Sequence, residues 1–240
     1  KDRNTGNYFA RIWFEPERNL YLSALFNGGL VYLDPEQGTI TPFKDQSGKL
    51  PFEGKVIKGI TKVSENDICI TSEDGGIWLI DPFKMTCEQL PLKIPDNTIS
   101  IKKTFMVDES KLALTHNKGL IIYDLNEKEV TDRHVTDVFA NQEVHCVRGT
   151  SKNGLIIGMF KEGVAIQQKS GFEFTSVTTD SNRISLKGSD VTGFAQSDDS
   201  TIWITTRHKG LFRYDLEGSR LERRNLNPIS KSLEGIVYYR

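Results

Sequence analysis

The sequence lacks the features of several common classes of protein. Lysine and arginine total 31 against 32 aspartates and glutamates, so the net charge is −1 and no basic block is present to follow a nucleic-acid backbone. No window approaches the roughly 18 apolar residues of a transmembrane helix. The start, residues 1–4, has neither an initiator methionine nor a signal peptide. We therefore expect a mature or excised piece that does not bind nucleic acid and meets a membrane only through a parent protein.

Cysteine is scarce, and metal-binding patterns are missing. Cys69, Cys87 and Cys146 cannot all pair within one chain, and Cys69 and Cys146 lie in strand-like surroundings, so we expect buried free thiols. The four histidines show no HExxH spacing, and no CxxC pair occurs. The sequence predicts neither a metal site nor a cofactor.

Amphipathic helices are missing too, and a repeat takes their place. No stretch offers the dozen or more helical-period residues that a crossover between parallel strands needs. Five versions of one hexapeptide begin at glycines spaced 47, 43, 44 and 47 residues apart, namely Gly29, Gly76, Gly119, Gly163 and Gly210. A polar turn lies just before each glycine, and another apolar run lies before that turn. One further strand-like run lies upstream of this pair, and one more lies downstream. The fourth run follows an aspartate turn in most units, at Asp34, Asp81, Asp124 and Asp215.

Four short antiparallel strands in about 45 residues is the pattern of one propeller blade. The prediction is an all-β fold, a β-propeller with four-stranded antiparallel blades, five repeats of about 45 residues and the start of a further blade. An open β-solenoid is the alternative. We take 1–240 as a single propeller segment, with blades at 8–43, 56–90, 101–130, 143–177 and 190–226, and with 233–240 beginning the next blade.

The fifth unit, 198–206 followed by 210–215, resembles the motif of the two-component-regulator propeller repeat family, and the second and third units are similar to weaker copies. Units one, three and four depart from the motif because they lack a tryptophan at the position of Trp203. The resemblance implies the periplasmic sensor region of a hybrid two-component histidine kinase. In that family a membrane span, kinase, receiver and often a DNA-binding domain follow, and the ligands are commonly oligosaccharides.

The resemblance thus implies a ligand-sensing extracytoplasmic propeller that detects an oligosaccharide and signals to regulate transcription. Its partners would be the rest of the sensor kinase and a second copy in a homodimer. A protein–protein interaction propeller is the alternative, and a propeller polysaccharide lyase is a weaker one. No Asp or Glu lies inside the five expected inner strands, so a paired general acid and base is missing. We expect no catalytic residue in this segment.

Two groups of residues are candidates for ligand binding. Basic side chains fall on or beside the inner strands, at Arg11, Lys58, Lys103 and His145, and predict an electropositive channel suited to an anionic sugar. Pairing with nearby carboxylates is the other interpretation. The turns between second and third strands and the long connections between repeats should share one end of the blades. That end carries His116, His134, Arg183, Arg207 and His208.

Overall fold

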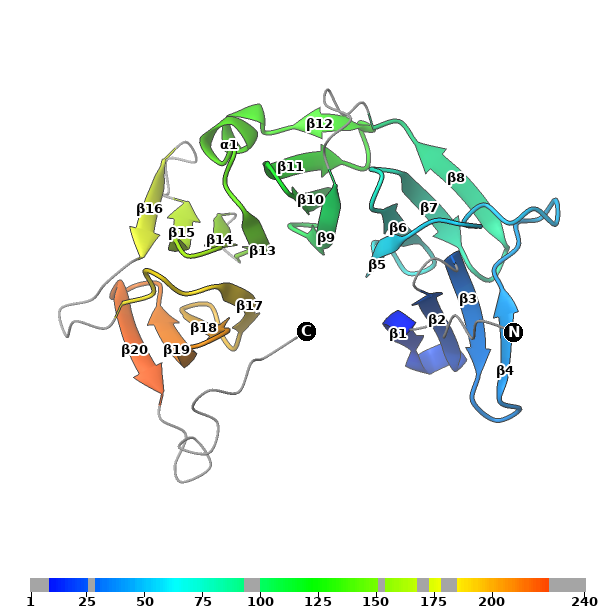
Figure 1. The fold of residues 1–240 in the computed structure, drawn as a ribbon, viewed down its shortest axis with the longest axis horizontal. Helices are drawn as coiled ribbons and strands as arrows, with labels where there is room; N and C mark the ends of the chain where they lie inside the picture. Colours follow the sequence, from blue (N-terminus) through cyan, green and yellow to red (C-terminus); the bar gives the residue numbers. More distant parts are fainter. Residues whose placement is uncertain are drawn as a thin grey trace, which may run out of the picture. The chain divides into compact units, whose positions relative to one another are not determined.

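The computed structural model describes residues 9–25, 29–92, 100–150, 154–167, 173–177 and 185–224. These residues form five four-stranded sheets, and within every sheet the strands lie side by side in chain order (Figure 1). The sheets are the four-stranded blades that the repeat predicts. The expected start of a further blade, 233–240, lies outside the described residues.

The first strand of each sheet contains the upstream apolar run, and the third begins at or just after the repeated glycine. The first two sheets consist of β1 (Phe9–Glu15), β2 (Leu20–Leu25), β3 (Gly29–Asp34) and β4 (Thr39–Pro42), and of β5 (Ile57–Lys62), β6 (Ile68–Ser72), β7 (Ile77–Asp81) and β8 (Thr86–Leu90). The third and fourth consist of β9 (Ile101–Met106), β10 (Lys111–His116), β11 (Gly119–Asp124) and β12 (Glu129–Thr131), and of β13 (Val144–Gly149), β14 (Leu155–Met159), β15 (Gly163–Gln167) and β16 (Phe174–Val177). The fifth consists of β17 (Val191–Gln196), β18 (Thr201–Thr206), β19 (Gly210–Asp215) and β20 (Arg220–Arg224).

In the described part of the chain, two short helices interrupt this pattern. A 3-10 helix, η1 (Pro16–Arg18), joins β1 to β2, and α1 (Arg133–Val138) lies in the connection before β13, where the sequence suggested only a loop. The first strand β1 also runs one residue further than expected, to Glu15, whose side chain is buried. The expectation that the first strands contain no carboxylate is therefore wrong for β1, because Glu15 is its last residue. Among the described residues, no helix is long and apolar enough to cross a membrane.

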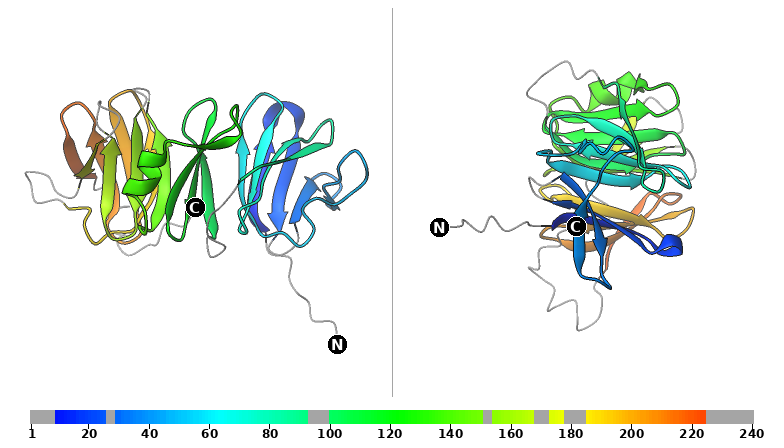
Figure 2. Two further views of the ribbon diagram at one scale, coloured as in Figure 1. Left: turned by 90° about the horizontal axis from the view of Figure 1, so that it is seen from above. Right: turned by 90° about the vertical axis from the view of Figure 1, so that its right-hand side faces the viewer.

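The chain divides into two compact units, residues 1–104 with 124–129 and residues 105–123 with 130–240. In the first unit, β5 contacts β1 and β2, and one core joins the first two sheets around Phe43, Phe52 and Trp78. In the second unit, β17 contacts β13 and β14, and the fourth and fifth sheets face each other across a second core (Figure 2). The middle strands β6 and β14 are buried along their whole length, and Ile68 and Ile70 of β6 and Ile156 of β14 belong to these two cores.

The turns between the third and fourth strands are built by aspartate, as predicted. The carboxylate of Asp81 accepts hydrogen bonds from the backbone N–H groups of Phe83 and Lys84, at 2.9 and 3.0 Å. The same pair of bonds recurs at Asp34, Asp124 and Asp215. The three cysteines are free and lie at buried or half-buried positions, also as predicted. Burial raises the pKa of the Cys69 thiol to about 12.

Candidate ligand-binding site

One backbone hydrogen bond recurs in three blades and fixes the end that the sequence singles out. The N–H of Glu73 donates to the carbonyl of Val56, that of Phe160 to Glu143, and that of Arg207 to Asp190, each at 2.9 Å. Each bond joins the first residue after the second strand to the residue just before the first strand. We call this end of a blade its turn end. The turns and the connections between repeats therefore meet there, as the strand order predicts.

The first strand of four sheets starts with a β-bulge at the turn end. In β5, Ile57 pairs with Ser72 and Gly59 with Thr71, so Lys58 is the extra residue. The equivalent extra residues are Ala10 in β1, His145 in β13 and Thr192 in β17. A bulge changes the direction in which a side chain points and is frequent beside functional sites. Two of the predicted binding residues, Lys58 and His145, thus occupy one and the same position of the repeat.

The Lys58 ammonium is neutralised by a carboxylate in its own blade. Its Nζ lies 3.0 Å from Oε2 of Glu73, and the Ser100 hydroxyl donates to the other Glu73 oxygen at 3.1 Å. The hydrogen bond from Lys58, with a smaller one from Ser100, holds the pKa of Glu73 below its usual range despite partial desolvation. Beside it, Lys55 pairs with Asp74 at 2.6 Å. The turn end of the second blade is therefore a balanced ionic network.

Two predicted basic residues of the second unit, Arg207 and His145, also have partners. Arg207 lies 3.4 Å from a carboxylate oxygen of the buried Asp190. His145 Nε2 lies 3.3 Å from Glu143, and its ring is 5.5 Å from the ring of Phe160. The interpretation of these groups as partners of nearby carboxylates is the one that the geometry favours. Glu73, Glu143 and Asp190 are not among the residues predicted from the sequence, although each lies within two residues of a strand end or a predicted turn.

His116 is a buried turn residue. Its side chain is 4% exposed, and its Nδ1 accepts the Lys118 N–H at 3.2 Å. Burial, with a smaller contribution from Lys118, lowers the pKa of His116 to about 4. The imidazole is therefore neutral at pH 7 and closes the turn after β10, much as the Thr206 hydroxyl accepts the Lys209 N–H in the fifth blade.

The remaining predicted residues are dispersed. Arg11 and Lys103 are half-buried in β1 and β9, and burial lowers the pKa of Arg11. His208 is exposed in the turn after β18. His134 belongs to α1, but its side chain, like the whole of Arg183, lies outside the described part of the chain. The predicted residues do not converge on one described pocket.

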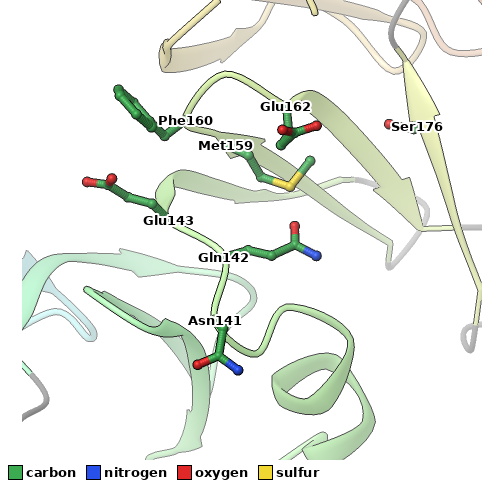
Figure 3. A pocket seen from close by; sticks show the side chains of 7 residues that line it. All are labelled: Asn141, Gln142, Glu143, Met159, Phe160, Glu162 and Ser176. Carbon is green, nitrogen blue, oxygen red and sulfur yellow. The ribbon is translucent and has the colours of Figure 1, made fainter. Parts of the chain in front are cut away.

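An open pocket of about 610 Å³ lies at the turn end of the fourth blade, within the second unit. It is lined by Asn141, Gln142, Glu143, Met159, Phe160, Glu162 and Ser176. Figure 3 shows Gln142 and Met159 extending toward the side of Glu162 and Ser176, whereas Glu143 and Phe160 extend the other way. His145 borders the pocket through its contacts with Glu143 and Phe160. The sequence predicts that the turns after the second strands and the connections between repeats share this end, but none of the pocket-lining residues is among the predicted binding residues.

The lining groups suit a polar ligand. Two amides and a hydroxyl can donate and accept hydrogen bonds, two carboxylates can only accept, and Met159 and Phe160 provide apolar surface. Lys161 places its ammonium 4.8 Å from the centre of the Phe160 ring. Within the described ranges, no group of three or more His, Cys, Asp or Glu side chains is placed to hold a metal ion.

Comparisons with known proteins define the fold. No protein-family model and no curated protein matches the sequence. An extracellular domain from B. thetaiotaomicron, assigned to a hybrid two-component system, matches the structure with a TM-score of 0.67 at 16% identity, over 91% of this chain and 28% of that one. A second such domain gives 0.63 at 17%, over 95% and 31%. The WD40 repeats of RRP9 give 0.66 at 11%, over 92% and 65%.

The fold is a β-propeller. Five four-stranded sheets and these neighbours confirm the all-β propeller prediction. The chain spans less than a third of the two bacterial extracellular domains that it matches. Two of these neighbours are extracellular domains assigned to hybrid two-component systems, and the third consists of WD40 repeats.

Proposed function

We propose that this chain is part of the ligand-sensing, extracytoplasmic propeller of a hybrid two-component sensor, and that it detects an oligosaccharide. The observation that carries the proposal is the pocket at the turn end of the fourth blade, where amide, carboxylate and hydroxyl groups lie beside aromatic and thioether surface. Sites for hydroxyl-rich ligands combine such groups, since each sugar hydroxyl both donates and accepts. The likeness to two bacterial extracellular sensor domains and the repeat motif of the fifth unit support the same role.

The wider setting belongs to the same proposal. The parent protein would be a periplasmic-facing inner-membrane histidine kinase that works as a homodimer and regulates transcription. In it, the propeller would provide only the input. Ligand binding at a rigid blade end would change how this segment contacts the rest of the sensor, and the kinase would respond.

The test is calorimetric titration of the 240-residue chain with neutral, uronic-acid-containing and sulfated oligosaccharides, and of two pocket variants, Gln142→Ala and Phe160→Ala. Their matched controls, Gln37→Ala and Phe83→Ala, make the same changes in turns at the opposite end of other blades. Binding that both pocket variants weaken and both controls leave unchanged supports the proposal. If no oligosaccharide in the three classes binds, the proposed function is wrong.

A protein-interaction propeller is the second candidate, and exposed apolar side chains in the first unit favour it. Phe83 and Met85 are 40% and 42% exposed in the turn after β7, and Leu50 is 36% exposed in a neighbouring loop. A backbone hydrogen bond from Gln46 to Met85 ties that loop to the turn. Sedimentation of the wild-type chain and of a Phe83→Ser, Met85→Ser variant tests self-association through this surface. A monomer in both cases argues against a homodimer formed there.

A further inference from the structure

Three basic groups at the turn end of the second unit are engaged by the chain itself. Arg207 pairs with Asp190, and the Lys209 ammonium donates to the backbone carbonyls of Ser185 and Lys187 at 3.0 and 2.6 Å. The Lys161 ammonium lies over the Phe160 ring. An anionic ligand would have to compete with these contacts.

The charge on the pocket wall has the opposite sign. Among the described residues, its ionisable lining groups are the carboxylates of Glu143 and Glu162. Glu143 lies against His145, whereas Glu162 is exposed and has no ion pair or side-chain hydrogen bond among the described residues. Glu162 lies on the side toward which Gln142 extends (Figure 3). A carboxylate that accepts hydrogen bonds, in the same pocket as an amide that donates them, is suited to hydroxyl groups and repels a second carboxylate.

From this arrangement we infer that the fourth-blade pocket selects an uncharged, hydroxyl-rich saccharide and excludes uronate and sulfated sugars, with Glu162 as the residue that sets this specificity. The inference rests on the proposed function and deepens it. It also replaces the electropositive channel as the basis of ligand choice. Glu162 would accept hydrogen bonds from sugar hydroxyls. The Gln142 amide nitrogen donates one hydrogen bond to the Val138 carbonyl at 3.3 Å, and its second N–H would donate to a sugar hydroxyl oxygen.

The experiment pairs neutral oligosaccharides with counterparts that carry a carboxylate at C6, such as oligomers of galactose and galacturonic acid or of glucose and glucuronic acid. Affinities are measured by calorimetry for the wild-type chain, for Glu162→Gln and for Glu162→Lys. The control, Glu36→Lys, reverses an exposed charge in the turn between β3 and β4, at the opposite end of another blade.

The wild-type chain is expected to bind a neutral oligosaccharide at least about tenfold more tightly than its uronate counterpart. Glu162→Gln should weaken neutral binding about tenfold, because one charge-assisted hydrogen bond is lost. Glu162→Lys should shift the uronate-to-neutral affinity ratio by about tenfold or more toward uronate, and Glu36→Lys should not change it.

The outcomes separate this inference from the function it rests on. Tighter binding of the uronate by the wild-type chain, or an affinity ratio that Glu162→Lys does not change, overturns the charge selection and leaves oligosaccharide sensing intact. Absence of binding to every oligosaccharide overturns both. Circular dichroism and thermal melts check that the variants fold. Because the Glu162 side chain is exposed, its replacement is expected to leave the fold intact.

Discussion

Lys58 and His145 occupy equivalent positions in two blades: each is the extra residue of the β-bulge that begins a first strand. Both contact the residue that follows the second strand of the same sheet, Glu73 for Lys58 and Phe160 for His145. One backbone arrangement thus presents an ion pair in one blade and an imidazole beside an aromatic ring in another. The repeat keeps the geometry constant while the side chains differ, and recognition sites on rigid scaffolds are usually built in this way.

The Lys58–Glu73 pair should stabilise the fold in a pH-dependent manner. Its side chains are 27% and 45% exposed, so solvent screening limits the contribution to about 0.5 kcal/mol. Because the pKa of Glu73 is lowered on folding, the stabilisation is present above the ordinary pKa of glutamate and is lost as the pH falls through the lowered value. Glu73→Gln should reduce the free energy of unfolding in urea at pH 7, and by less at pH 2.5. An equal effect at both pH values, or an effect from the control Glu36→Gln, would contradict this.

His116 should make the second unit less stable in mild acid. The pKa of His116 is lowered to about 4, below the ordinary histidine value of about 6.5, so the unfolded chain binds its proton first as the pH falls. Between pH 6.5 and 4 this histidine alone should lower the free energy of unfolding by about 1.4 kcal/mol per pH unit. His116→Gln keeps an acceptor for the Lys118 N–H and should remove that slope. The exposed His208, changed to Gln, should leave it in place.

Replacement of Ser219 by glycine should stabilise the fifth sheet. In the four described turns after third strands, one residue has a positive φ, namely Gly38, Met85, Lys128 and Ser219, at 65°, 56°, 55° and 49°. A non-glycine residue in this region is strained, so Ser219→Gly should raise the free energy of unfolding by about 0.5–1 kcal/mol. Glu217→Gly, in the same turn but without positive φ, should not stabilise. The measurement is urea unfolding, and equal effects of the two changes would refute the explanation.

A methyl group at Gly158 should destabilise the second unit. A Cβ built there would lie 2.5 Å from the Cys146 sulfur and 2.6 Å from a methyl carbon of Val191, inside the core between the fourth and fifth sheets. Overpacking of this kind costs about 1–3 kcal/mol. Gly158→Ala should lower the midpoint of urea unfolding accordingly, and adding Cys146→Ala should recover part of the loss. If the double variant is no more stable than the sum of its single changes predicts, the sulfur contact is not the cause.

Much of the fold could be predicted because its signals are local. The spacing of Gly29, Gly76 and their equivalents fixed the repeat, and the apolar runs on either side of each glycine indicated the central hairpins. Asp34 and its equivalents act as turn formers for a reason contained in the residue itself, since a short carboxylate reaches the next backbone N–H groups. The extension of β1 to Glu15 and the helix α1 were missed because tertiary packing decides where such elements end.

The sequence by itself determined the repeat, the strands and which turns share an end of each blade, because hydrophobic period and turn chemistry act over a few residues. The tertiary structure alone decided which charges are neutralised. Lys58 pairs with Glu73, and Arg207 pairs with Asp190, over sequence separations of 15 and 17 residues. The β-bulges and hairpins that bring these residues together cannot be predicted from a local sequence pattern. It also placed Gln142, Glu162 and Ser176 around one pocket, since three separate segments must fold together before their side chains can share a ligand.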